Sequence, residues 1–135
     1  MKDSCKEVLN FVKENDVKVI RLAFCDNMGL QKNISLQPGE LERAFENGIP
    51  FNAWELPGFH LPVGTKLLLR PDARTLSVLP WRPSSGRVIC LFCDLMNADG
   101  SPYGGDTRAM LQKSVLEAAK AGYAVRIGSA CAFYL

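Results

Sequence analysis

The sequence predicts an α+β fold, in which a mixed β-sheet carries a packed helix and is followed by an appended helix and strand. Two observations predict it. Segments rich in β-branched and aromatic residues lie between turn residues, and three further stretches repeat their apolar residues at helical spacing. A chain of 135 residues is about one ordinary domain, large enough for a single packed core.

The composition is that of an average globular protein, with 47% hydrophobic and 22% charged residues. The net charge is +2, and the Lys and Arg residues are scattered, which argues against a nucleic-acid or anionic-membrane surface. No apolar run approaches the roughly 20 residues that a membrane span needs. The N-terminus has no secretory pattern, so a cytoplasmic location is expected.

The first part of the chain predicts a helix and a hairpin. Ser4-Cys5-Lys6-Glu7 has the form of a capping box, and the helix that it opens ends near Asn15. Strands at 17–25 and 30–36 flank the turn residues 26–29, a pattern typical of a β-hairpin.

The middle of the chain predicts a second helix, a loop and a second hairpin. Pro38 and Gly48 bracket the helix. Residues 49–66 have no sustained period and are interpreted as a long loop or flap. Apolar segments at 67–69 and 75–79 then flank a turn and predict the second hairpin.

The last part predicts a connector at 81–86, a strand around Cys90, and a helix from Thr107 to about Ala121, with Asp106 as its N-cap and Gly122 closing it. Segments 123–127 and 131–135 are strand-like. Two hairpins, a helix across them and a fifth strand form a β-grasp-like unit, predicted for residues 1–96. Residues 97–135 form the appended helix and strands.

The five cysteines are odd in number and lack framework spacing, which favours free thiols. Cys90 and Cys93 have the C-x-x-C form of a zinc or redox site. However, they lie inside a predicted strand, where residues three apart point to opposite faces. Buried apolar cysteines are the preferred interpretation, and a zinc or thiol-redox protein is the alternative.

A series of short motifs resembles the glutamine synthetase family in order and spacing. The motifs are Val19-Ile20-Arg21-Leu22-Ala23-Phe24-Cys25-Asp26 with Gly29, Gly48-Ile49-Pro50-Phe51, Gly58-Phe59, Leu69-Arg70-Pro71-Asp72 with Thr75-Leu76, Leu79-Pro80-Trp81, Phe92-Cys93-Asp94 with Asp99-Gly100, Asp106-Thr107-Arg108 with Leu111, Gly122, and Phe133-Tyr134-Leu135. None is specific alone, because a single Pro-Asp or Asp-Gly is turn chemistry. Their colinearity over nearly the whole chain carries the resemblance.

The resemblance implies the N-terminal β-grasp domain and the start of the catalytic domain of an ATP-dependent glutamate–ammonia or glutamate–amine ligase. In that family the small domain of one subunit roofs an active site of its neighbour in a ring, and ATP with Mg²⁺ or Mn²⁺ takes part. The implied partners are a homo-oligomer or the missing catalytic domain. No cofactor is expected on this chain alone, and no phosphate-cradling glycine loop is found.

The metal-binding glutamates of the family are absent at the end of the chain. The family has Gly-x-Glu-x-Glu-Phe there, and two carboxylates two apart on a strand face the same way. This chain has Ala130 and Ala132 at those positions, while Cys131 projects to the other face. Alanine offers no ligand, so no metal site is expected.

Two further positions match acidic residues of the family. Asn52 replaces the aspartate that favours ammonium, and an amide has neither its charge nor its basic site. Lys66 replaces the second acidic residue, and a cation there would repel ammonium. Ordinary loop drift or a different amine substrate explains both changes as well as loss of the ammonium site does. Arg108 is interpreted as structural, paired with a nearby carboxylate.

Two hypotheses for the function therefore stay open. The chain is the N-terminal part of a glutamine-synthetase-type ligase, truncated and not catalytic by itself, or it is a free-standing β-grasp interaction or regulatory module derived from that family. The resemblance implies a role in nitrogen metabolism and glutamine biosynthesis for both hypotheses. The apolar residues near the end of the chain favour the first.

Overall fold

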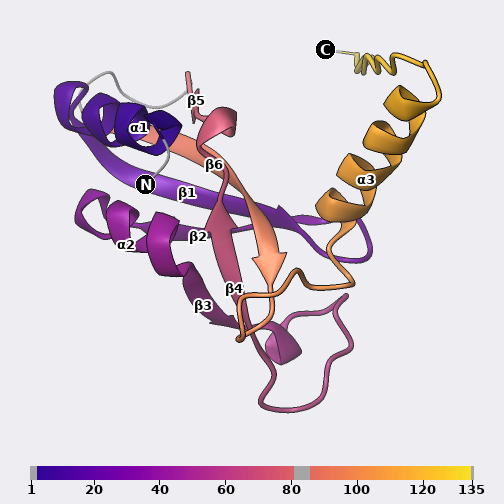
Figure 1. Cartoon of the computed structure of the whole chain (residues 1–135). Coiled ribbons are helices and arrows are strands. Elements are labelled where there is room, and N and C mark those ends of the chain that lie inside the picture. The colour runs from indigo at the N-terminus through magenta and orange to yellow at the C-terminus, as the bar shows by residue number, and fades with distance from the viewer. Residues whose placement is uncertain (1–2, 81–85, 135) are drawn as a thin grey trace.

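A computed structural model describes residues 3–80 and 86–134 and contains a mixed sheet with helices against it (Figure 1). The strand order is β2-β1-β6-β4-β3, and β5 also pairs with β6. The two central strands, β1 (Val17–Cys25) and β6 (Arg87–Met96), run parallel, and the other pairs are antiparallel. This confirms the predicted α+β class with a mixed sheet.

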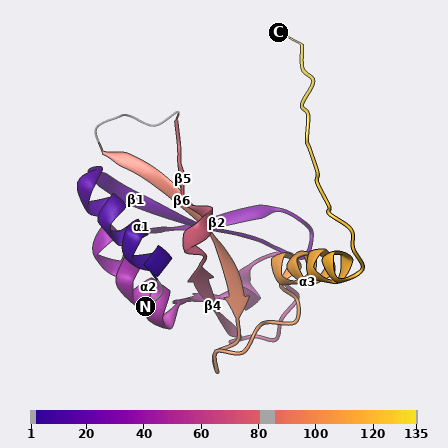
Figure 2. The ribbon, with the colours of Figure 1, turned by 45° about the horizontal axis from the view of Figure 1, so that its top comes forward.

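Two helices, α1 (Asp3–Glu14) and α2 (Leu41–Asn47), lie on the same side of the sheet (Figures 1 and 2). They bury Val8, Val12, Leu41 and Ala44 in the core. The sheet contributes alternate residues of each strand, because successive side chains of a strand point to opposite faces. The core strand residues include Ile20, Leu22, Phe24, Leu67, Leu69, Ile89, Leu91, Cys93 and Leu95.

The first hairpin forms where the sequence predicts it, between β1 and β2 (Gln31–Leu36). Its turn is fixed by Asp26, whose Oδ1 accepts hydrogen bonds from the backbone N–H of Met28 and of Leu30, each at 2.9 Å. The Asp26 side chain is buried, and Lys32 Nζ lies 3.0 Å from its Oδ2. Burial raises the pKa of Asp26, but the Leu30 and Met28 amides and the Lys32 ammonium outweigh burial, so the pKa ends below its usual range.

The second helical segment is also confirmed. A 3₁₀ turn, η1 (Pro38–Glu40), leads directly into α2. Gly48 ends the helix with a φ of 73°, a conformation that favours glycine, and its N–H donates to the carbonyl of Ala44.

The prediction for residues 49–66 is wrong at the start of that segment. Residues Ile49–Asn52 form strand β3, which pairs antiparallel with β4 (Lys66–Pro71), and only the part between them is a loop. This loop begins with a 3₁₀ turn, η2 (Ala53–Glu55). The sequence hid β3 because a four-residue strand containing a proline has no visible period, and only pairing with β4 defines it.

The second predicted hairpin is also wrong. β4 does not pair with β5 (Ser77–Val78); both run antiparallel to β6 and follow each other along one edge of it. The 3₁₀ turn η3 (Ala73–Thr75) separates them. Because η3 carries the chain onward instead of reversing it, the two segments cannot face each other. The predicted connector at 81–86 lies, except for Gly86, outside the described residues.

Helix α3 (Thr107–Lys120) projects away from the sheet, and none of its residues is buried (Figures 1 and 2). Its N-cap is Asp106, as predicted, with Oδ1 accepting from Arg108 N at 3.0 Å. Gly122, at a φ of 86°, follows the helix, and the N–H of Tyr123 returns to the carbonyl of Ala118. These bonds form a Schellman end, with Gly122 closing the helix as the sequence predicts.

The strands predicted at 123–127 and 131–135 do not form in the described residues. Residues 123–134 have no regular secondary structure and are exposed, and Leu135 lies outside the description. A strand needs a hydrogen-bonded neighbour, and the sheet offers none near these residues. Within 3–80 and 86–134, no helix has the length and apolar character required to cross a membrane.

The loop after β3 is anchored on the first hairpin by Gly58. A Cβ added at Gly58 would lie 2.8 Å from both Cγ and Oδ2 of Asp26, and its φ is +97°. Both constraints require glycine, because a side chain would be strained and would also collide with a buried carboxylate.

We therefore predict that Gly58→Ala lowers the free energy of unfolding by about 3 kcal/mol, combining left-handed strain with overpacking. Gly64→Ala is the matched control, since Gly64 has a φ of +86° but nothing within 4 Å of its added Cβ. It should cost about 1 kcal/mol. Urea unfolding of both variants measures the difference, and equal losses would contradict the close packing on Asp26.

Candidate functional site

Asn52 and Lys66, the two residues that the sequence analysis identified, lie at the end of the β3–β4 hairpin where the loop joins the strands, which is called the hairpin end below. In the antiparallel register Asn52 lies directly opposite Lys66. Both are exposed. Residues directly opposite on one face of a sheet are neighbours, so the amide and the ammonium share one surface. The two positions form one site.

A third polar residue of this site, Glu55, was not predicted. Asn52 Nδ2 donates a hydrogen bond to Glu55 Oε1 at 3.0 Å across the 3₁₀ turn η2. The only signal in the sequence is a carboxylate three residues after Asn52, a spacing that suits one helical turn. The hairpin end therefore carries an amide, a cation and a carboxylate, which can hydrogen-bond and pair with charged small molecules.

An aromatic cluster holds this hairpin against the core. The ring centroids of Phe24 and Phe51 are 5.0 Å apart, and Phe59 lies 6.3 Å from Phe24 and 6.2 Å from Phe51. Tyr103 extends the cluster, at 6.4 Å from Phe59. These distances are those of favourable tilted and edge-on pairs. The cluster joins β1, β3, the loop and the segment before α3.

The start of α3 is held by an ionic cluster, which confirms the structural interpretation of Arg108. Arg108 donates to Oδ2 of Asp72 at 2.7 Å and to Oδ1 of Asp94. Arg74 also pairs with Asp72, with its Nη2 at 2.9 Å from Oδ2. Asp106 adds a link to the sheet, because its buried Oδ2 accepts from Leu95 N at 3.0 Å. Polar contacts thus fix the beginning of α3.

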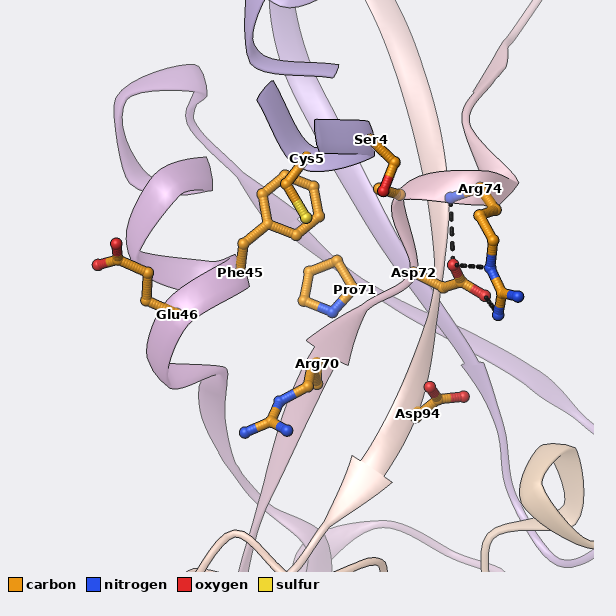
Figure 3. A pocket seen from close by; sticks show the side chains of 10 residues that line it. Ser4, Cys5, Phe45, Glu46, Arg70, Pro71, Asp72, Arg74 and Asp94 are labelled. Carbon is orange, nitrogen blue, oxygen red and sulfur yellow. Dashed lines mark hydrogen bonds and ion pairs between the residues drawn. The ribbon is translucent and has the colours of Figure 1, made fainter. Parts of the chain in front are cut away.

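The charges in this cluster change the acidity of Asp72. The hydrogen bonds from the Arg74 guanidinium (Figure 3) have the largest effect on the pKa of Asp72 and lower it. Burial opposes them, but the hydrogen bond from Arg108 adds to the lowering, so this pKa lies well below its usual range. The carboxylate is therefore ionised throughout the physiological range.

The end of the chain does not offer the ligands of a metal site. Ala130 and Ala132 lie in the exposed segment after α3, where Cys131 is also exposed. In the described ranges, no three His, Cys, Asp or Glu side chains gather closely enough to hold an ion. Because divalent cations that bind ATP phosphates prefer several oxygen ligands, the residues present do not fit such a metal.

The C-x-x-C pair lies within β6, with both residues buried at 8% and 1% relative exposure for Cys90 and Cys93. Cys93 faces the helices and belongs to the core cluster, whereas Cys90 faces the other side of the sheet. Burial raises the pKa of both thiols, most strongly that of Cys93. This arrangement favours packing over metal or redox chemistry.

Comparison with known proteins agrees with this fold. The family model described as "Glutamine synthetase, beta-Grasp domain" matches residues 16–98. The chain is 37% identical over 130 residues to the glutamine synthetase of Clostridium saccharobutylicum, covering 96% of this chain and 29% of that protein. It is 38% identical over 130 residues to that of Methanosarcina mazei, with the same coverage of 96% and 29%.

Two solved structures share the fold. The one titled "Apo GmaS without ligand" has a TM-score of 0.75 at 23% identity, covering 84% of this chain and 26% of that one. The other, "GmaS/ADP complex-Conformation 1", has a TM-score of 0.72 at 23% identity, covering 84% and 25%.

The chain belongs to the glutamine synthetase family and contains its β-grasp domain. It spans about 29% of the length of these two curated relatives. The family resemblance drawn from the sequence is confirmed.

The ionic cluster predicts a pH dependence of stability. The pKa of Asp72 in the folded protein lies below its ordinary value of 3.8, so the folded state binds this proton more weakly than the unfolded state. The stabilisation that the ionised Asp72 contributes is fully present well above its ordinary pKa of 3.8, and it is lost as the pH falls through that value toward the lowered pKa. We expect Asp72→Asn to unfold at a lower temperature than the parent protein at pH 7. The difference in unfolding temperature, the gap, should become smaller by pH 2. Thermal unfolding at several pH values measures the gap, and a constant gap would refute the assignment.

The burial of the cysteines predicts their order of alkylation. Cys131 is exposed, whereas Cys93 is almost fully buried with a raised pKa. We expect iodoacetamide at pH 8 to modify Cys131 on the order of 100-fold faster than Cys93, which reacts only when the strand opens. Mass spectrometry of timed digests gives both rates, and labelling in urea supplies the control. Equal rates in the folded chain would contradict the buried position of β6.

Proposed function

We propose that this chain is the β-grasp part of a glutamine-synthetase-type ligase and that it is not catalytic by itself. The observation that carries the proposal is coverage: 96% of the chain matches glutamine synthetase, but only 29% of that protein is matched. Ala130 and Ala132 support the second half of the proposal, because they leave the chain without the carboxylates that metal-assisted phosphoryl transfer requires.

In this proposal residues 1–96 form the β-grasp domain and residues 97–135 begin a second domain. The apolar residues of α3 support it. Met110, Leu111 and Leu116 are 52%, 58% and 62% exposed, although residues of this kind are normally covered. The ligase part that would use ATP, Mg²⁺ or Mn²⁺, glutamate and an amine would cover this helix. The exposed hairpin end with Asn52 and Lys66 would face the active site of a neighbouring subunit in the cytoplasm.

A second function, a free-standing interaction module, is favoured by the same exposed residues. A module released from catalysis could keep the fold and bind a synthetase through α3 and the segment after it. The two proposals differ in one property: the module binds an intact synthetase, whereas a ligase part associates with the remainder of such an enzyme.

We predict that the 135-residue chain, supplied with ATP, Mg²⁺, glutamate and hydroxylamine, forms no γ-glutamyl hydroxamate above background. The intact C. saccharobutylicum enzyme is the positive control. Product from the chain alone would refute the proposal.

Association is tested separately, by light scattering after mixing the chain with either the intact enzyme or that enzyme shortened to the part beyond its matched 130 residues. Association with the shortened enzyme alone supports the ligase part. Association with the intact enzyme identifies the module instead.

A further inference from the structure

The sheet has two edges, because its strand order ends in β2 on one side and in β3 on the other. An edge strand directs backbone N–H and C=O groups away from the sheet, where a strand of another molecule can pair with them. Proteins protect such edges with short strands, prolines, bulges or exposed charges. The two edges of this sheet differ in that protection.

β3 is a protected edge. It has only four residues, Ile49–Asn52, and the second of them is Pro50, which has no N–H to donate. The 3₁₀ turn η2 follows directly, so the extended backbone ends at Asn52. An added strand could therefore form few hydrogen bonds with β3.

β2 lacks these protections. It has six residues without a proline, and its register with β1 is continuous from Gln31 to Leu36, so no bulge bends it. Its single charged residue is Lys32, whose Nζ lies 3.0 Å from the buried carboxylate of Asp26 and whose side chain is only 22% exposed. Within residues 3–80 and 86–134, β1 is the only strand that pairs with β2. β2 is therefore the edge to which a further strand can be added.

The hydrogen bonds of the first hairpin identify the free backbone groups of β2. The N–H of Asp26 donates to the carbonyl of Leu30 at 3.1 Å, which makes these two residues a hydrogen-bonded pair of the β1–β2 ladder. Bonded and non-bonded pairs alternate along an antiparallel ladder. Residues 32, 34 and 36 therefore bond to β1, whereas residues 31, 33 and 35 direct their N–H and C=O groups outward.

This pattern of outward groups is complementary to a second copy of itself. In an antiparallel pair with Asn33 opposite the same residue of the second copy, Gln31 lies opposite Ser35, and Leu30 lies opposite Leu36. Each outward residue then meets an outward residue, which gives about six backbone hydrogen bonds, two for each bonded pair. A shift by one residue would place outward residues opposite inward ones and would break this match.

The side chains of this pairing are compatible on both faces of the joined sheet. The polar side chains of residues 31, 33 and 35 are exposed and would meet one another on the face away from the helices. On the other face Leu30, which is 62% exposed, would meet Leu36, a half-buried residue at the border of the core. Lys32 would lie opposite Ile34, so like charges do not oppose each other.

We propose that β2 is a dimerisation edge, through which two copies of this chain pair antiparallel about a two-fold axis at Asn33. The two sheets then become one continuous sheet, with the same strand contributed by each copy. Because pairing over residues 30–36 forms a small interface, we expect a reversible dimer with a Kd on the order of 100 μM. The dimer is independent of the ligase proposal, because it involves neither the hairpin end nor α3.

Light scattering of the 135-residue chain, between about 10 μM and about 1 mM, measures this association. Asn33→Pro removes the outward N–H at the centre of the interface and leaves every bond to β1 in place. We expect it to raise the Kd on the order of 100-fold, because both central hydrogen bonds are lost. Asn33→Thr is the matched control, since it keeps the N–H and favours a strand, and it should leave the Kd unchanged. Circular dichroism reports whether each variant is folded.

Disulfide cross-linking tests the register, in a chain that carries Cys131→Ser to remove the exposed native thiol. Asn33→Cys should link two copies under mild oxidation, because facing Cα atoms of a bonded pair are about 5.5 Å apart. Gln31→Cys is the control, since the two copies of residue 31 lie roughly 14 Å apart along the strands in this register. Mass spectrometry of the digests identifies which residues are linked.

The exposed apolar residues of α3 are the competing surface for self-association. Leu116, which is 62% exposed, lies on that helix, and Leu116→Arg should leave the Kd unchanged. A dimer that Leu116→Arg abolishes and Asn33→Pro leaves intact would assign the association to α3 and overturn the proposal. A chain that stays monomeric at about 1 mM would overturn it too, as would equal cross-linking of the two cysteine variants.

Discussion

The parallel pairing of β1 with β6 is the constraint on which the rest of the structure depends. It joins segments separated by more than sixty residues and places them at the centre of the sheet. Every other strand pairs directly or indirectly with these two, and α1 and α2 cover the face that they share. The hairpin end lies on β4, whose position is fixed by its pairing with β6, and the edge strand β2 is fixed by its pairing with β1.

The sequence predicted the elements whose signals are local. Capping residues and helical spacing gave α1, α2 and α3, and turn residues with flanking alternation gave the first hairpin. It failed where structure depends on a distant partner. β3 exists only because β4 lies beside it, β4 and β5 share β6 instead of each other, and the last residues lack a neighbour with which to form a strand.

The same limit on prediction from sequence applies to the side chains of the candidate site, because their contacts also depend on distant residues. Asn52 and Lys66 were identified through the family resemblance, but their direct opposition follows from a register that the sequence does not contain. For Glu55 the sequence offers only a carboxylate three residues after Asn52, a pattern too common to predict a site. A carboxylate partner for Arg108 was predicted, yet its two partners are 36 and 14 residues away, and only the fold brings them to the helix.

The attachment of α3 has a consequence for how the family can diversify. Its first turn is tied to the sheet by Arg108 and Asp106, and no apolar side chain of the helix enters the core. Replacing a few polar residues could therefore change the orientation of α3 relative to the sheet while leaving the β-grasp core intact. A polar attachment of this kind would allow one small domain to be combined, during evolution, with second domains in different orientations.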